Sequence, residues 1–181
     1  MYRWSLSDMN CISCHIDQGS LGSSQIASDP TGYYYAVGSK TGVVNIYEED
    51  NMAEKVGTNQ DSQRNAVFDA FASHHQENGT HKFSSLPAPS PIKAVMNLTT
   101  TVDLLRFNHD GQILALGSRR KKDQFKLVHV ASKTVFQNWP TSQTPLHYVT
   151  SIDFSPGGGF LAIGNDRGRV LLYRLNHYFS S

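Results

Sequence analysis

The feature that most constrains the fold is one short segment that occurs three times. The copies are GYYYAVGS at 32–39, GQILALGS at 111–118 and GGFLAIGN at 158–165, displaced from one another by 79 and 47 residues. The first and last copies remain aligned, without a gap, as far as Tyr47 and Tyr173. A short polar turn with glycine opens or precedes each copy: DPTG, NHDG and SPGG. Repeats of about 40 to 50 residues indicate propeller blades or helical arrays.

The residue types within each repeat decide between these two architectures. The first copy contains YYYAVG followed by VVNIY, and the last contains VTSIDF, FLAIG and VLLYRL. Short β-branched and aromatic runs between turn residues are typical of strands, whereas helices need longer stretches with a 3.6-residue period, and none is present. The sequence therefore predicts an all-β fold, a partial β-propeller of antiparallel four-stranded blades.

We group the predicted strands into three blades and one remnant strand. YRWSL at 2–6 is similar to LYRL at 172–175 and predicts a strand of a preceding blade. The predicted strands are 10–16, 23–28, 33–38 and 43–47; then 92–98, 102–107, 112–118 and 125–130; then 134–138, 147–154, 159–164 and 169–175.

Three blades do not close a ring, because propellers have about 4 to 8 blades. We therefore expect the sequence to be the C-terminal portion of a longer propeller, or the translation of a truncated gene model. The alternative is closure by association of several copies. Within the sequence, the predicted organisation is a remnant and first blade at 1–48, a disordered polar insert at 49–91, and two blades with a short tail at 92–181. The insert is too poor in apolar residues to form a core of its own.

Composition excludes several classes of function. Charged residues make up 17% and hydrophobic residues 39%, and the formal net charge is +1. The net charge is too small for the protein's overall electrostatic potential to attract nucleic acid or an anionic membrane. No run approaches the roughly 20 apolar residues of a membrane span. The first fifteen residues lack the basic segment and the apolar segment of a signal peptide. We therefore expect an intracellular protein whose contacts with any nucleic acid are local.

Two motifs suggest metal or haem binding, but each has a simpler explanation. CISCH at 11–15 has the spacing of a haem attachment motif, yet on an extended strand Cys11 and Cys14 point to opposite sides. HHQENGTH at 74–81 has no cysteine and no scaffold to fix its histidines. We therefore predict no cofactor, no metal and no catalytic residue.

GNDRG at 164–168 is similar to a phosphate-binding loop, but strands flank it on both sides. It lacks the helix N-terminus that such a loop uses, so it predicts a hairpin turn with Gly168 at positive φ. Asp153 is the candidate for the aspartate that tightens WD-repeat blades, and Ala27 and Arg106 occupy the equivalent positions.

The candidate contact residues form the one dense basic run, RRKK. It lies in a hairpin of the second repeat that we predict to be three residues longer than its neighbours, so the four side chains project from a propeller face. Such a cluster neutralises phosphates or meets an acidic protein; the alternative is a solvated hairpin tip. The four residues are Arg119, Arg120, Lys121 and Lys122.

The longer strings carry a family resemblance. PIKAVMNL, KLVHV, TVFQNWP and GNDRGRVLLYRLNHY are more specific than the blade motifs, which hundreds of WD-repeat proteins share. With them, the chain resembles the C-terminal half of the WD-repeat family of U3 small nucleolar RNA-associated protein 18. The resemblance covers nearly all of the chain except the insert at about 49–90.

This resemblance implies a non-catalytic scaffold of the small-subunit processome, acting in nucleolar pre-rRNA processing and maturation of 18S rRNA. The implied partners are other processome proteins, several of them WD-repeat propellers, together with U3 small nucleolar RNA and pre-rRNA, reached directly or through the complex. No membrane and no small-molecule substrate is expected. Alternatives are a WD-repeat platform in another pathway, such as a ubiquitin-ligase adaptor, and a haem or redox protein built on CISCH.

Overall fold

The computed structural model describes residues 2–4, 6–7, 9, 11–14, 17, 21–49 and 90–175. Within these ranges the regular structure consists of strands, and none of the described residues forms a helix of the length and apolarity that a membrane span requires. The strands are β1 Tyr2–Trp4, β2 Cys11–Cys14, β3 Ser23–Ser28, β4 Tyr34–Ser39, β5 Val44–Glu48, β6 Lys93–Val95, β7 Leu104–Phe107, β8 Ile113–Gly117, β9 Phe125–His129, β10 Thr134–Val135, β11 Val149–Phe154, β12 Phe160–Asn165 and β13 Val170–Arg174.

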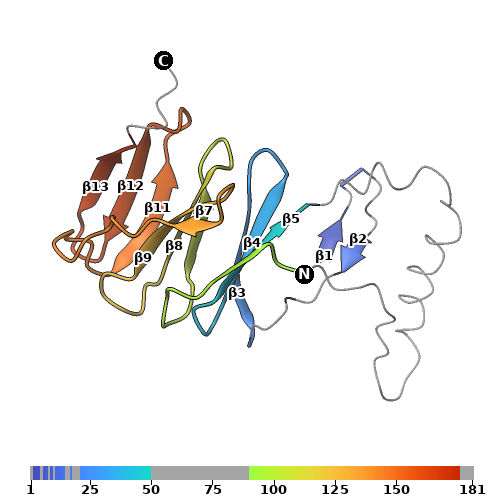
Figure 1. Ribbon diagram of the computed structural model, residues 1–181, viewed down its shortest axis with the longest axis horizontal. Helices are drawn as coiled ribbons and strands as arrows, with labels where there is room; N and C mark the ends of the chain where they lie inside the picture. Colours follow the sequence, from blue (N-terminus) through green and yellow to red (C-terminus); the bar gives the residue numbers. More distant parts are fainter. Residues whose placement is uncertain are drawn as a thin grey trace, which may run out of the picture. The chain divides into compact units, whose positions relative to one another are not determined.

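The strands form antiparallel sheets in which neighbours in sequence are neighbours in space. One sheet has the order β3-β4-β5-β6, the next β7-β8-β9-β10, and the third β11-β12-β13, while β1 and β2 pair with each other. The three larger sheets stand side by side in Figure 1, and contacts join β3 to β7 and β7 to β11. This arrangement confirms the all-β prediction and is consistent with propeller blades.

The grouping of strands differs from the prediction by one strand in each blade. β6 pairs with β5, with Val44 opposite Val95, so the strand expected to open the second blade closes the first. In the same way β10 pairs with β9, with Val135 opposite Val128. The strand predicted at 10–16 pairs with β1 rather than with β3. The order of strands along a chain does not specify which neighbour each pairs with, and the long insertion before β6 suggested a break there.

In each of the three large sheets, the turn between the first and second strands contains the same kind of side-chain hydrogen bond. In each case the side chain of the first turn residue accepts the N–H of the residue five positions later, which stabilises the reversal. The bonds run from the Tyr34 N–H to Asp29 Oδ1 (3.1 Å), from the Ile113 N–H to Asn108 Oδ1 (2.8 Å) and from the Phe160 N–H to Ser155 Oγ (3.0 Å).

The middle sheet is buried on both faces because its side chains alternate between two cores. Leu114 and Leu116 of β8 lie in the core shared with the first sheet. Ile113 and Ala115 of the same strand lie in the core shared with the third. Successive residues of a strand point to opposite faces, so a strand buried on both sides is apolar throughout. This explains the uninterrupted run ILAL in the second repeat.

The third sheet has one buried and one exposed face. Leu161 and Ile163 of β12 are fully buried against the middle sheet. On β13, which is the outermost strand of this sheet, Val170 and Leu172 are 73% and 65% exposed. A blade inside a ring has both faces covered, so the outer face of this sheet is the one that a following blade would cover.

The predicted disordered insert at 49–91 falls almost entirely outside the described residues. Glu49, Ser90 and Pro91 are described, and Ile92 donates its N–H to the Ile46 carbonyl at 2.8 Å. The histidines of HHQENGTH and the side chains of CISCH also lie outside the described part.

Candidate nucleic-acid or partner interface

The basic run lies in the loop that joins β8 to β9, at residues 118–124. The side chains of Arg119, Arg120, Lys121 and Lys122 are all exposed. The strand register shows that this hairpin is two residues longer than its neighbours, not three as predicted. Its last paired residues are Gly117 and Phe125, eight positions apart, whereas the paired residues are six positions apart in the hairpins closed by Gly38 and Val44 and by Gly164 and Val170.

The loop is held by bonds at both ends. Ser118 donates its N–H to the Gln124 carbonyl at 3.0 Å, which closes the hairpin. Arg119 donates its N–H to Oδ2 of Asp103 at 3.0 Å. At the other end, Asp123 and His147 exchange two bonds. Asp123 donates its N–H to the His147 carbonyl at 2.9 Å, and Asp123 Oδ1 accepts the His147 N–H at 2.8 Å. The backbone of the basic run is therefore fixed while its side chains extend into solvent.

The cationic heads have few partners. Lys122 Nζ lies 3.9 Å from Asp123 Oδ2, an exposed pair. Lys121 Nζ donates to Thr99 Oγ1 at 3.3 Å. Across residues 21–49 and 90–175, Arg119, Arg120 and Lys121 form no ion pair. Exposed pairs of this kind contribute about 0 to 1 kcal/mol, so the charges are available to an external anion.

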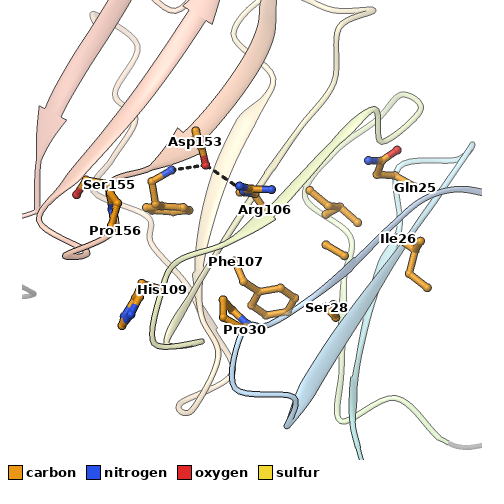
Figure 2. A pocket seen from close by; sticks show the side chains of 13 residues that line it. Gln25, Ile26, Ser28, Pro30, Arg106, Phe107, His109, Asp153, Ser155 and Pro156 are labelled. Carbon is orange, nitrogen blue, oxygen red and sulfur yellow. Dashed lines mark hydrogen bonds and ion pairs between the residues drawn. The ribbon is translucent and has the colours of Figure 1, made fainter. Parts of the chain in front are cut away.

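A second candidate site is a cavity of about 620 Å³ along β3, β7 and β11, which are the first strands of the three large sheets. Figure 2 shows Arg106 and Asp153 meeting across it, with His109 and Pro30 at its turn end. Arg106 Nε donates to Asp153 Oδ1 at 3.0 Å, and both side chains are more than half exposed.

The ionisable side chains that line the cavity are Arg106, Asp153 and His109. No group of three His, Cys, Asp or Glu side chains able to hold a metal occurs in the described residues. Asp153, the candidate blade-tightening aspartate, accepts the N–H of Phe154 at 2.9 Å and joins the second sheet to the third through Arg106. It lies at the boundary of two sheets, and the equivalent Ala27 has no polar group to repeat the pair.

The turn at GNDRG is a β-hairpin, as predicted. It joins β12 to β13, and Gly168 has φ of 70°. Asn165 Oδ1 accepts the N–H of Arg167 and that of Arg169, both at 3.1 Å. The Asn165 side-chain oxygen is therefore committed to the backbone of its own hairpin turn.

Sequence reasoning missed three cations that occupy turns equivalent to the basic loop. Lys40 follows Ser39 in the β4–β5 turn, and Arg167 and Arg169 follow Asn165 in the β12–β13 turn. All three side chains are exposed. The repeat alignment contained the signal, since each cation lies one to four residues after the Ser or Asn that ends the shared segment.

Comparison with known proteins finds relatives that share one name. The chain is 40% identical over 178 residues to the U3 small nucleolar RNA-associated protein 18 homolog of Arabidopsis thaliana, with 98% of this chain and 27% of that protein covered. It is 40% identical over 179 residues to the mouse homolog, with the same coverage. The Saccharomyces cerevisiae protein is 42% identical over 154 residues, which cover 85% of this chain and 21% of that protein. No family model matches the chain.

These similarities confirm the resemblance read from the sequence. The chain spans about a quarter of the length of the relatives it matches. The alignments cover nearly all of the chain, so the likeness includes the sheets described above and not one blade motif alone.

Proposed function

Because this chain is homologous to part of U3 small nucleolar RNA-associated protein 18, we propose that it serves as a non-catalytic WD-repeat scaffold of the small-subunit processome. In this role it acts in nucleolar pre-rRNA processing and in maturation of 18S rRNA. The observation that carries the proposal is homology over 98% of the chain at 40% identity.

The fold supports a role in binding rather than in reaction. The strands present faces and edges to a partner, and the ionisable side chains at the cavity beside Arg106 are that arginine, its ion-pair partner Asp153 and His109. The proposed partners are other processome proteins, U3 small nucleolar RNA and pre-rRNA. The proposed contact point is the loop with Arg119, Arg120, Lys121 and Lys122, because its backbone is anchored and its charges are exposed. Flexible cations on a turn suit phosphates better than base edges.

Affinity purification of the tagged full-length protein from cells tests this function. We expect U3 RNA and processome proteins to be recovered with it. Recovery of cullin-type ubiquitin-ligase subunits without U3 RNA would replace the proposal with an adaptor function, and a Soret band in the purified protein would indicate haem.

A variant tests the contact point separately. Replacing all four residues of the basic loop with Ser is expected to leave the protein folded, since changes at exposed turns shift stability by less than about 0.5 kcal/mol. Cross-linking to RNA at this loop is expected to fall. Unchanged cross-linking would show that the run is a solvated hairpin tip.

A further inference from the structure

Five segments at one end of the three large sheets form a continuous hydrogen-bonded rim. They are the turns and loop that join the second and third strands of each sheet, together with the two connections between sheets. We call this surface the hairpin rim. It comprises residues 39–43, 96–103, 118–124, 141–148 and 165–169.

The first half of the rim joins the β4–β5 turn to the basic loop through the 96–103 connection. Val102 donates its N–H to the Ser39 carbonyl at 3.0 Å, and Thr101 Oγ1 donates to the Lys40 carbonyl at 3.1 Å. On its other side the connection contacts the basic loop, where Thr100 Oγ1 donates to Ser118 Oγ at 2.8 Å. The Asp103–Arg119 bond lies beside this contact.

The second half joins the basic loop to the β12–β13 turn through the 141–148 connection. Asp123 and His147 exchange the two bonds described above. Tyr148, which follows His147 in the chain, makes the corresponding contact with the third sheet. Asp166 donates its N–H to the Tyr148 carbonyl at 3.0 Å, and Asp166 Oδ1 accepts the Tyr148 N–H at 3.3 Å. The cations of all three sheets therefore belong to one bonded surface.

Charge on the hairpin rim is strongly one-sided. Its three carboxylates, Asp103, Asp123 and Asp166, each accept a backbone N–H, which commits part of their hydrogen-bonding capacity to the protein. At the opposite end, the turns DPTG, NHDG and SPGG contain two aspartates and no Lys or Arg, and the β9–β10 turn adds one cation, Lys133. The exposed cations of the rim are Lys40, Arg119, Arg120, Lys121, Lys122, Arg167 and Arg169.

An exposed tyrosine lies between two of the segments that carry these cations. Tyr148 is 42% exposed and its backbone is fixed by the bonds to Asp166. His147 bonds to Asp123 of the basic loop and Tyr148 bonds to Asp166, so the backbone of Tyr148 lies between the basic loop and the turn with Arg167 and Arg169. Proteins that bind single-stranded nucleic acid combine a row of cations with exposed aromatic rings, because cations neutralise the backbone and a ring stacks on a base.

We propose that the hairpin rim as a whole, and not the RRKK loop alone, binds single-stranded RNA, with the seven cations contacting phosphates and Tyr148 stacking on a base. The proposal rests on the function proposed above, since that function supplies an RNA partner. It names the chemistry of the ligand and adds Lys40, Arg167, Arg169 and Tyr148 to the contact surface.

The test uses the full-length protein and a single-stranded RNA of 30 nucleotides and mixed sequence. Affinity is measured between 50 and 200 mM salt for the wild type and three variants. The first variant is K40S/R167S/R169S, which leaves the basic loop intact. The second is K93S/K126S/K133S, a control that removes three cations outside the rim. The third is Tyr148→Ala, with Tyr148→Phe as its conservative partner.

Cations and stacking give different signatures. The logarithm of the affinity falls as the logarithm of the salt concentration rises, and each lost phosphate contact makes this slope shallower by about 0.7 on a single strand. We therefore expect the slope of K40S/R167S/R169S to be shallower by about 2. The control variant is expected to keep the wild-type slope. Tyr148→Ala is expected to lose roughly fivefold or more in affinity with no change in slope, and Tyr148→Phe to bind as the wild type does.

Several results overturn the proposal. One is a wild-type slope in K40S/R167S/R169S, which would confine binding to the basic loop. A second is a slope in the control variant K93S/K126S/K133S that is reduced as much as in K40S/R167S/R169S. A third is tighter binding of double-stranded than of single-stranded RNA, with an affinity that Tyr148→Ala does not change. Loss of an acidic protein partner from the variants, with RNA binding unchanged, would assign the rim to that protein. Recovery of U3 RNA from cells is measured in parallel. A normal recovery with an unchanged slope rejects the rim, whereas no recovery with a reduced slope rejects the proposed function.

Discussion

The backbone N–H of Arg119 donates a 3.0 Å hydrogen bond to Oδ2 of Asp103, so an acidic side chain fixes the first residue of the basic run. Asp103→Ala removes the acceptor and is expected to cost about 1 kcal/mol of unfolding free energy. The amide hydrogen of Arg119 is expected to exchange faster with solvent, as measured by NMR. Asp103→Asn keeps an acceptor oxygen and is the matched control. Equal exchange rates in Asp103→Ala and wild type would show that the bond does not hold the loop.

The close approach of Gly38 to Val102 predicts a specific difference between two equivalent glycines. A β-carbon on Gly38 would lie 2.6 Å from Val102 Cγ1, and Val102 is fully buried. Gly38→Ala is therefore expected to destabilise the protein by about 1 to 3 kcal/mol through overpacking. At Gly117, in the equivalent position of the second repeat, the nearest atom would lie 3.3 Å away. Gly117→Ala is expected to cost less than about 1 kcal/mol, and urea unfolding of the two variants measures the difference.

Burial raises the pKa of Tyr173 above its ordinary value of 10.0. The ring packs against Trp139, with centroids 4.8 Å apart. The folded protein therefore keeps the phenol proton at a pH where the unfolded chain loses it. Folding then binds protons above about pH 10, so this part of the stability is present below pH 10 and is lost as pH rises.

Tyr173→Phe tests this dependence because phenylalanine does not titrate. The fall in unfolding free energy between pH 9 and pH 11 is expected to be smaller in Tyr173→Phe than in the wild type. Urea titrations at the two pH values measure it. An equal fall in both proteins would show that Tyr173 is not responsible.

The sequence predicted the strands well because each is a short apolar run between turns that require particular residues. Gly168 is an example, since a hairpin of this length needs a positive φ and glycine adopts it without strain. Strand partners were harder to predict. Val95 faces Val44 across a gap of about fifty residues, and no local pattern relates the two.

The candidate site was only partly predictable for a similar reason. A dense run such as RRKK is visible in one dimension, but Lys40 and Arg169 are isolated in the sequence. They join the basic loop only because equivalent turns of successive blades lie at one end of the sheets. The roles of Asp103 and Asp123 were also hidden, since their bonds are to backbone groups and follow no residue pattern.

The most direct test of the account is ultraviolet cross-linking in cells followed by identification of the cross-linked peptides by mass spectrometry. RNA recovered with the full-length protein is sequenced in the same experiment. The account predicts that U3 RNA or pre-rRNA is attached to peptides of the hairpin rim, above all to the loop 118–124 and to the segment that contains Tyr148. Cross-links confined to the opposite turns, at 29–32, 108–111 and 155–158, would contradict it.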